Sequence, residues 1–123
     1  MGLVAEIRAG LLIAADDVVQ VTSAVCHGPA VFTNVKLSDG KYLVSGQTVT
    51  GFSNDEEDAV GLSSAMPFML ETVLKERGGD FVKAEQAWGP KVVASGKDGK
   101  LITGQNPASA ADIADVVLKA VAA

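Results

Sequence analysis

A short β-branched run that ends at a cysteine constrains this fold more than any other feature of the sequence. Residues 18–25 read VVQVTSAV and place apolar side chains on both faces of an extended chain. Such a strand is buried on both sides, which is typical of the parallel sheets of α/β proteins. Cys26, His27, Gly28 and Pro29 follow directly. Because proline suits the first turn of a helix, the pattern predicts a strand, a sharp turn and a short helix.

Helix and strand signals alternate along the rest of the chain, which predicts one layered α/β domain over residues 1–123. Further strands are expected at 41–44, 47–50, 81–85, 91–95 and 101–103. The first two of these would form a hairpin, and a tight turn at Asp98-Gly99 would join the last two. Helices are expected at 2–15, from Asn54, at 68–77 and after Asn106, whose side chain would cap the last helix.

The composition excludes several classes of function. The chain has 123 residues, 48% of them hydrophobic, and its formal net charge is −5. An acidic chain without a basic cluster is not expected to bind nucleic acid or an anionic membrane. No apolar run approaches the length of a membrane span, so a cytoplasmic location is the default expectation. One cysteine and one histidine do not supply the ligand spacing of a metal site, and no glycine-rich cofactor motif is present.

Cys26 and His27 are the residues best suited to chemistry. Sites in open α/β sheets form beyond the carboxyl ends of the strands, which is where this pair is expected. A thiol beside an imidazole and at a helix N-terminus is expected to ionise readily and to act as a nucleophile. The spacing is equally compatible with a small buried side chain that only packs.

A third group is needed to orient the imidazole, and the sequence offers three acids. Asp55, Glu56 and Glu57 follow another expected strand end and could reach the same edge of the sheet as His27. An acidic triplet in the first turn of a helix is also typical of a solvated surface, because it complements the helix dipole. The residue pattern alone favours the solvated alternative.

Four blocks of sequence resemble the ThiJ/PfpI superfamily, in its group of heat-shock chaperones and glyoxalase III enzymes. In order, they are AVCHGPA (24–30), DGKYLVSGQTVTGFSNDEE (39–57), the Pro67-Phe68 helix and LITGQNPASA (101–110). The resemblance covers the chain from Val18 onward and matches only the C-terminal half of the family. It implies a flavodoxin-like three-layer sandwich with a mainly parallel sheet, incomplete by itself or completed by association.

The resemblance also implies a function. Cys26 would be the nucleophile, His27 the proton shuttle, and Glu57 the acid that orients His27 and balances its charge. The family activity is the glutathione-independent conversion of methylglyoxal, a small 2-oxoaldehyde, to lactate. The Cys26 thiolate would add to the aldehyde as a hemithioacetal, and His27 would move a proton between the two carbons. No cofactor or metal is implied.

Other functions stay open because residues 1–17 are too short to supply the family's N-terminal portion. The missing half could belong to another chain, or the chain could form a homo-oligomer that covers its exposed sheet edge. It could also be a stress-related holdase with little catalysis. A cysteine hydrolase or amidase, and a redox sensor at Cys26, are further alternatives.

Overall fold

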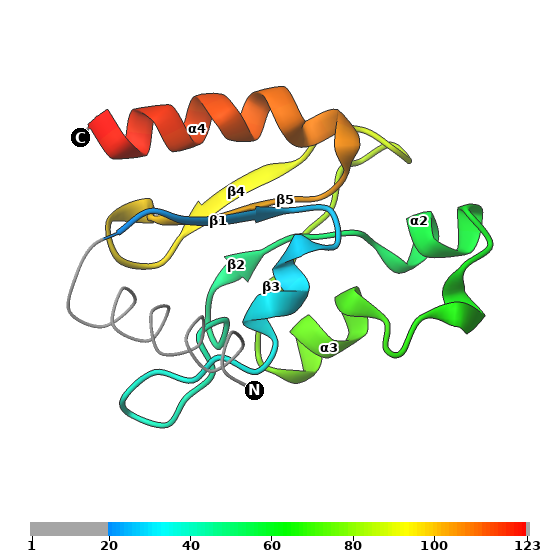
Figure 1. Cartoon of the computed structure of the whole chain (residues 1–123), viewed down its shortest axis with the longest axis horizontal. Helices are drawn as coiled ribbons and strands as arrows, with labels where there is room; N and C mark the ends of the chain where they lie inside the picture. Colours follow the sequence, from blue (N-terminus) through cyan, green and yellow to red (C-terminus); the bar gives the residue numbers. More distant parts are fainter. Residues whose placement is uncertain (1–19, 123) are drawn as a thin grey trace.

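The computed structural model describes residues 20–122 and contains strands and helices in alternation (Figure 1). The strands are β1 (Thr22–Val25), β2 (Thr48–Val49), β3 (Asp80–Phe81), β4 (Val92–Ser95) and β5 (Leu101–Gly104). The α-helices are α2 (Asn54–Ala59), α3 (Leu70–Glu76) and α4 (Ala110–Ala122). Short 3-10 helices are η1 (Gly28–Phe32), η2 (Ser63–Ala65), η3 (Lys97–Gly99) and η4 (Pro107–Ser109). The helix expected at 2–15 lies outside the described residues.

The strands form two sheets, a mixed sheet of three strands and a parallel pair. The three-stranded part has the order β1–β5–β4, in which β5 is parallel to β1 and antiparallel to β4. β2 and β3 form a separate parallel pair. Because β1 and β5 are parallel and Val25 lies opposite Gly104, both strands end at the same edge of the sheet. Within residues 20–122, β1 pairs with β5 alone, and its other edge carries no strand.

Helices lie on both sides of this sheet, so the α/β class expected from the sequence is confirmed. Figure 1 shows α4 along one face of the sheet, with η1 and α3 on the other side. The main buried cluster lies on the side of η1 and α3 and includes Phe32, Val49 and Leu74. On α4, Ile113 is buried whereas Leu118 and Val121 are exposed.

The hairpin expected from residues 41–44 and 47–50 is wrong. Residues 43–46 form turns, Tyr42 makes an isolated bridge with Lys36, and β2 pairs with β3 instead. Leu43 and Val44 are nevertheless buried in the core. The apolar pattern there reports the burial of a loop, which the sequence alone does not distinguish from a strand.

Two element ends and one helix cap also differ from the expectations. β3 stops at Phe81, and α3 begins at Leu70, two residues later than expected. Asn106 occupies the position before η4, but its side chain makes no capping hydrogen bond. Its amide nitrogen donates instead to Glu56 and to the carbonyl of Gly89. The Asn106 side chain therefore makes hydrogen bonds to residues distant in sequence instead of capping the helix that follows it.

Candidate active site

The turn after β1, the end of β5 and the segment after β2 meet at one edge of the sheet. The Cys26 N–H donates to the carbonyl of Gly104 (3.0 Å), and the Phe52 N–H donates to the carbonyl of Cys26 (2.8 Å). The Thr50 N–H donates to Oγ1 of Thr103 (2.9 Å). These bonds connect three distant segments at the carboxyl ends of parallel strands, where sites in α/β folds form.

Cys26 occupies a strained turn between a strand and a helix. Its φ is +63°, in the left-handed region, and η1 begins two residues later with proline in its first turn. For a residue other than glycine, this backbone conformation costs about 1–3 kcal/mol of conformational energy. Such strained residues are concentrated at functional sites. Gly51 allows the neighbouring segment to approach, because a Cβ there would lie 2.9 Å from Leu70 and 3.4 Å from the Cys26 carbonyl oxygen.

The structure brings Cys26, His27 and Glu57 together. Sγ of Cys26 lies 3.6 Å from Nδ1 of His27, and Nε2 of His27 lies 2.8 Å from Oε2 of Glu57, thirty residues along the chain. The His27 side chain is 48% exposed, whereas that of Glu57 is 4% exposed. An ionised carboxylate only accepts hydrogen bonds, so when Glu57 is ionised Nε2 donates to it and the Nδ1 lone pair faces the thiol. A nucleophile, a base and an orienting acid have this arrangement.

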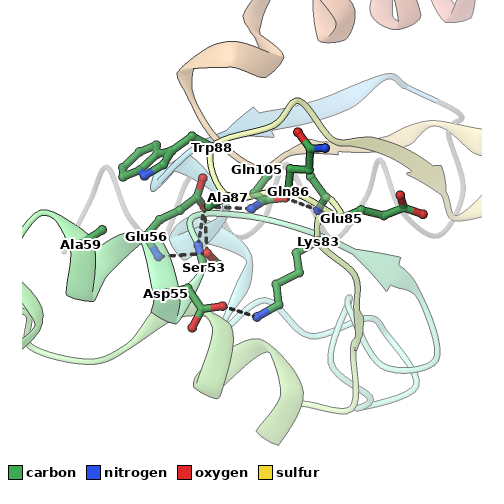
Figure 2. Close-up of a pocket in the computed structure, with 11 residues that line it drawn as sticks. Ser53, Asp55, Glu56, Ala59, Lys83, Glu85, Gln86, Ala87, Trp88 and Gln105 are labelled. Atoms are coloured by element: carbon green, nitrogen blue, oxygen red, sulfur yellow. Dashed lines mark hydrogen bonds and ion pairs between the residues drawn. The ribbon is translucent and has the colours of Figure 1, made fainter.

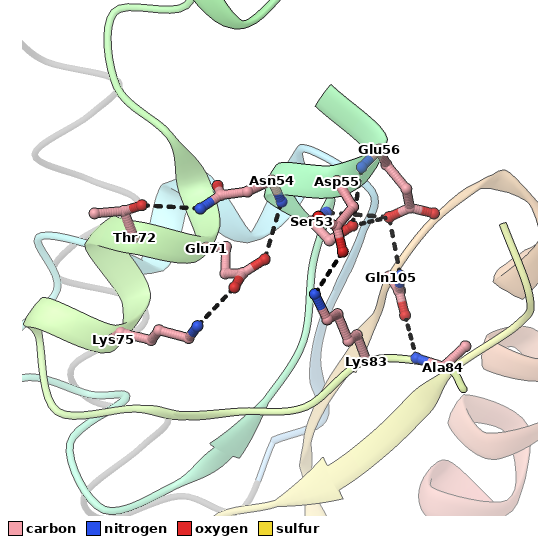
Figure 3. A network of polar contacts seen from close by, with 10 residues as sticks. All are labelled: Ser53, Asn54, Asp55, Glu56, Glu71, Thr72, Lys75, Lys83, Ala84 and Gln105. Atoms are coloured by element: carbon pink, nitrogen blue, oxygen red, sulfur yellow. Dashed lines mark hydrogen bonds and ion pairs between the residues drawn. The ribbon is translucent and has the colours of Figure 1, made fainter. Parts of the chain in front are cut away.

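Glu56, the neighbouring acid, is turned the other way and is 2% exposed. Its Oε1 accepts from the Ser53 N–H, the Ser53 hydroxyl and the Gln105 amide, and its Oε2 accepts from the Asn106 amide. Figure 3 shows the Oε1 bonds, which link the start of α2 to the residue after β5. Ser53 and Glu56 form a capping box, which explains why α2 begins where it does. Glu56 therefore holds the segment that carries Glu57.

The helix is anchored by two further carboxylates (Figure 3). Asp55 is exposed and pairs with Lys83 at 2.7 Å, a hydrogen bond that holds the pKa of Asp55 below its ordinary value. Glu71 of α3 accepts from the Asn54 N–H and from Lys75. Burial pushes the pKa of Glu71 up, but these two donors outweigh it and the net shift is downward. Of the acidic triplet, only Asp55 is solvated, so the solvated alternative is wrong for Glu56 and Glu57.

The electrostatics around the thiol oppose the expected easy ionisation. Burial raises the pKa of Cys26, and the backbone N–H of His27 lowers it by less. The charges of Glu56 and Glu57 raise it further. The direction of this shift is opposite to the easy ionisation expected from the sequence, since desolvation and two buried acids outweigh the favourable backbone contact. A base must take the proton when the sulfur attacks.

This shift predicts the pH dependence of thiol alkylation. Because the folded-state pKa lies above the ordinary value of 9.0, the thiolate fraction at pH 8 is smaller in the folded chain than in the unfolded chain. We expect iodoacetamide to label Cys26 several-fold more slowly in buffer than in urea at that pH, with a folded midpoint above pH 9. Mass spectrometry reports the labelling directly, because the chain has one cysteine. A folded midpoint near pH 7 would contradict the direction of the shift.

A pocket of about 150 Å³ lies beside the three residues but does not include them. Figure 2 shows Trp88 and Glu56 at one end of the pocket and Lys83 and Glu85 at the other. Its remaining lining residues come from α2, the segment 84–87 and Gln105. None of the three residues of the candidate triad lines it.

The described part of the chain contains neither a candidate metal site nor a helix that could span a membrane. Residues 20–122 contain no group of three or more His, Cys, Asp or Glu side chains that could hold a metal ion. Over the same range, no helix is both long enough and apolar enough to cross a membrane.

Sequence reasoning missed the roles of three residues that support the site. Phe52 packs on His27, and the buried side chains of Gln105 and Asn106 bind Glu56. Gln105 and Asn106 did carry a signal, since two polar residues directly follow the buried strand β5 at the edge where sites form. The contact of Phe52 had no such signal, because one aromatic residue after a strand is equally typical of the core.

Curated glutathione-independent glyoxalases are similar to the chain over about four fifths of its length. Glyoxalase 3 of Candida albicans is 35% identical over 105 residues, which are 81% of this chain and 43% of the relative. A probable glutathione-independent glyoxalase of Schizosaccharomyces pombe is 38% identical over 106 residues, 80% of this chain and 40% of the relative. The chain thus spans less than half the length of these relatives. No protein-family model matches it.

Solved structures lead to the same group. The Rapid Encystment Protein 24 KDa of Francisella tularensis superposes with a TM-score of 0.83 at 39% identity, over 94% of this chain and 49% of that chain. Glyoxalase III of Candida albicans superposes with a TM-score of 0.72 at 35% identity, over 81% of this chain and 43% of that chain. The aligned four fifths of this chain therefore belong to the ThiJ/PfpI family, in its group of glutathione-independent glyoxalases.

Proposed function

We propose that this chain carries the cysteine-dependent site of a glyoxalase III-like enzyme, which converts methylglyoxal or a similar small 2-oxoaldehyde to the 2-hydroxy acid. One observation carries the proposal: the His27 ring links the thiol to the carboxylate. Its Nδ1 lies 3.6 Å from Sγ of Cys26, and its Nε2 lies 2.8 Å from Oε2 of Glu57. The names of the relatives, which are glutathione-independent glyoxalases, support the class of substrate.

The first step forms a carbon–sulfur bond. Sγ of Cys26 attacks the aldehyde carbon while its proton passes to Nδ1 of His27 and then to the aldehyde oxygen. The product is a neutral hemithioacetal, and His27 is again an unprotonated base at Nδ1. The raised pKa of Cys26 suits this order, because the thiol keeps its proton until the base removes it during the attack.

The second step moves hydrogen between the two carbons. His27 takes the proton from the former aldehyde carbon, the electron pair forms a carbon–carbon double bond, and the neighbouring ketone oxygen becomes the oxyanion of an enediolate. The proton then returns from His27 to the neighbouring carbon, while the hydroxyl proton on the first carbon's oxygen passes to the oxyanion. The product is a thioester of the 2-hydroxy acid on Cys26. One carbon is oxidised and the other is reduced, so no external oxidant is needed. Water then attacks the thioester carbonyl, the carbon–sulfur bond breaks, and the thiol recovers its proton.

Glu57 makes these transfers possible by holding the imidazole. Its buried Oε2 accepts from Nε2 and leaves the basic Nδ1 towards the sulfur. Its other oxygen, Oε1, is buried and has no hydrogen-bond partner among residues 20–122. The charge of Glu57 is therefore available to the imidazolium that forms when His27 takes up a proton, since charge interactions are strong in a site of low polarity.

The decisive test is lactate formation by the 123-residue chain from methylglyoxal without glutathione, compared with Glu57→Gln. Glutamine can present an N–H towards Nε2 and carries no charge. We therefore expect kcat to fall about 10²-fold, with KM within about threefold. Lactate is measured by a coupled dehydrogenase assay at matched protein concentration.

Glu76→Gln is the matched control, because Glu76 is an exposed residue of α3. This variant is expected to keep the full rate. No lactate from the unmodified chain, or an unchanged kcat in Glu57→Gln, would refute the proposed function.

A further inference from the structure

The imidazole of His27 needs more support than one hydrogen bond. Its side chain is 48% exposed, and Nε2 is held by Glu57 at 2.8 Å. A bond at one end of the ring allows the ring to tilt, and tilting would move Nδ1 away from the sulfur. Proton transfer depends steeply on this geometry, because a displacement of about 1 Å in a catalytic group can cost about 10²-fold in rate.

Phe52 contacts both members of the Cys26–His27 pair. Its ring lies 4.3 Å from the His27 ring, centroid to centroid, with the planes tilted by 36°. Its backbone N–H donates to the carbonyl of Cys26 at 2.8 Å. Phe52 is only 5% exposed, so this ring is itself fixed by its surroundings. One buried residue thus holds the backbone under the thiol and one face of the imidazole.

Trp88 supports Phe52 from the other side. The two rings meet edge to face with centroids 5.6 Å apart, a favoured geometry for aromatic pairs. Trp88 has a φ of +64°, which is a true outlier for a bulky side chain. Backbone strain of this kind persists only where the surroundings impose it, and it is concentrated at functional sites.

Polar contacts hold the residue that follows Trp88. The Asn106 amide donates to the carbonyl of Gly89, the residue after Trp88, and also to Oε2 of Glu56, both at 2.7 Å. Glu56 is the neighbour of Glu57 in the first turn of α2. The same buried carboxylate therefore fixes the loop that carries Trp88 and the helix that carries Glu57.

From these contacts we propose that Phe52 and Trp88 form an aromatic support that positions His27 for proton transfer, and that the Glu56–Asn106–Gly89 contacts hold Trp88 in its strained conformation for this purpose. Phe52 and Trp88 are positioning residues, since they act through the imidazole. The proposal deepens the proposed function and rests on it for its kinetic consequences. Its structural content, a fixed plane of the His27 ring, does not depend on turnover.

The test replaces Phe52 by leucine, which keeps an apolar side chain and the backbone N–H but removes the ring. We expect kcat for lactate formation to fall about tenfold with KM within about twofold, because orientation is lost and binding is not. Phe52→Tyr, which retains the ring, should recover most of the rate. Phe81→Leu is the matched control, because Phe81 is a half-buried phenylalanine on β3 that packs against the core.

Proton NMR of the His27 ring provides a readout without turnover. His27 is the only histidine, so its ring protons are assigned without ambiguity. We expect the ring current of Phe52 to shift them upfield, and the shift to be lost in Phe52→Leu but kept in Phe52→Tyr and Phe81→Leu. If the shift behaves in this way but the unmodified chain makes no lactate, only the proposed function fails. If Phe52→Leu changes neither the shift nor kcat, the aromatic support is overturned.

A second variant covers the case in which Phe52→Leu does not fold. Trp88→Asn removes the outer ring but suits the left-handed backbone, which asparagine tolerates better than tryptophan does. We expect it to fold, to lower kcat by about threefold to fivefold, and to broaden or move the His27 resonances. Unchanged resonances together with an unchanged kcat in Trp88→Asn would overturn the proposal independently.

Discussion

Replacement of Cys26 by alanine is expected to lower lactate formation by about 10³-fold or more, to the level of the uncatalysed reaction. Without the sulfur, neither the hemithioacetal nor the thioester can form, and removal of a covalent nucleophile is among the largest single effects in enzymes. The chain has no second cysteine that could take over this role. The measurement is lactate released from methylglyoxal by the variant and by the unmodified chain at equal concentration.

Cys26→Ser is the companion variant, because serine keeps the size and the hydrogen-bonding capacity of the side chain. We expect it to be equally inactive, since a hydroxyl is a much weaker nucleophile than a thiol at neutral pH. Circular dichroism of both variants should match that of the unmodified chain. Lactate at the unmodified rate from either variant would show that Cys26 is not the nucleophile.

Glu56→Ala is expected to lower the free energy of unfolding by about 3 kcal/mol or more. The substitution leaves the Ser53 N–H, the Ser53 hydroxyl, and the amides of Gln105 and Asn106 without their carboxylate acceptor. Each buried donor left unpaired costs about 1–3 kcal/mol, reduced where water enters the space. Urea unfolding measures the change, with circular dichroism for the fold and the fluorescence of Trp88, the only tryptophan, for the loop beside Asn106.

Two further variants separate this effect from the mere loss of a charge. Glu56→Gln keeps one oxygen acceptor and places an N–H among the donors, so we expect an intermediate loss. Glu76→Ala removes an exposed glutamate of α3 and is expected to change stability by no more than about 0.5 kcal/mol. A loss below about 1 kcal/mol in Glu56→Ala would contradict the assigned structural role of this carboxylate.

Predictions from the sequence succeeded where neighbouring residues decide the structure. Strand β1, the turn at Cys26 and the start of α2 at Asn54 depend on β-branched side chains, on a proline and on a capping serine a few residues away. The hairpin failed because apolar residues of a buried loop, such as Leu43 and Val44, have the same pattern as a strand. Pairing between β2 and β3 joins segments about thirty residues apart, which no local pattern specifies.

The candidate site shows the same division. The residue pattern singled out Cys26 and His27, and the resemblance to the family singled out Glu57. The roles of the three residues in catalysis stay predictions. The pattern did not distinguish Glu56 from Glu57, although the two carboxylates point to opposite partners. Adjacent side chains of a helix are rotated by about 100° about its axis. Which partner each carboxylate binds therefore depends on the segment that packs against its side of the helix.

By itself, the sequence determined the α/β class, the strand that ends at Cys26, and the family to which the aligned part of the chain belongs. Local propensity and the order of motifs depend only on the type and order of the residues, so they can be recognised without a structure. Only the tertiary structure decided that Glu57 faces His27, that Phe52 and Trp88 support its ring, and that the pKa of Cys26 is raised. These properties depend on burial and on distances between residues up to 36 positions apart, as Phe52 and Trp88 are, since hydrogen bonds, ring contacts and desolvation act through space.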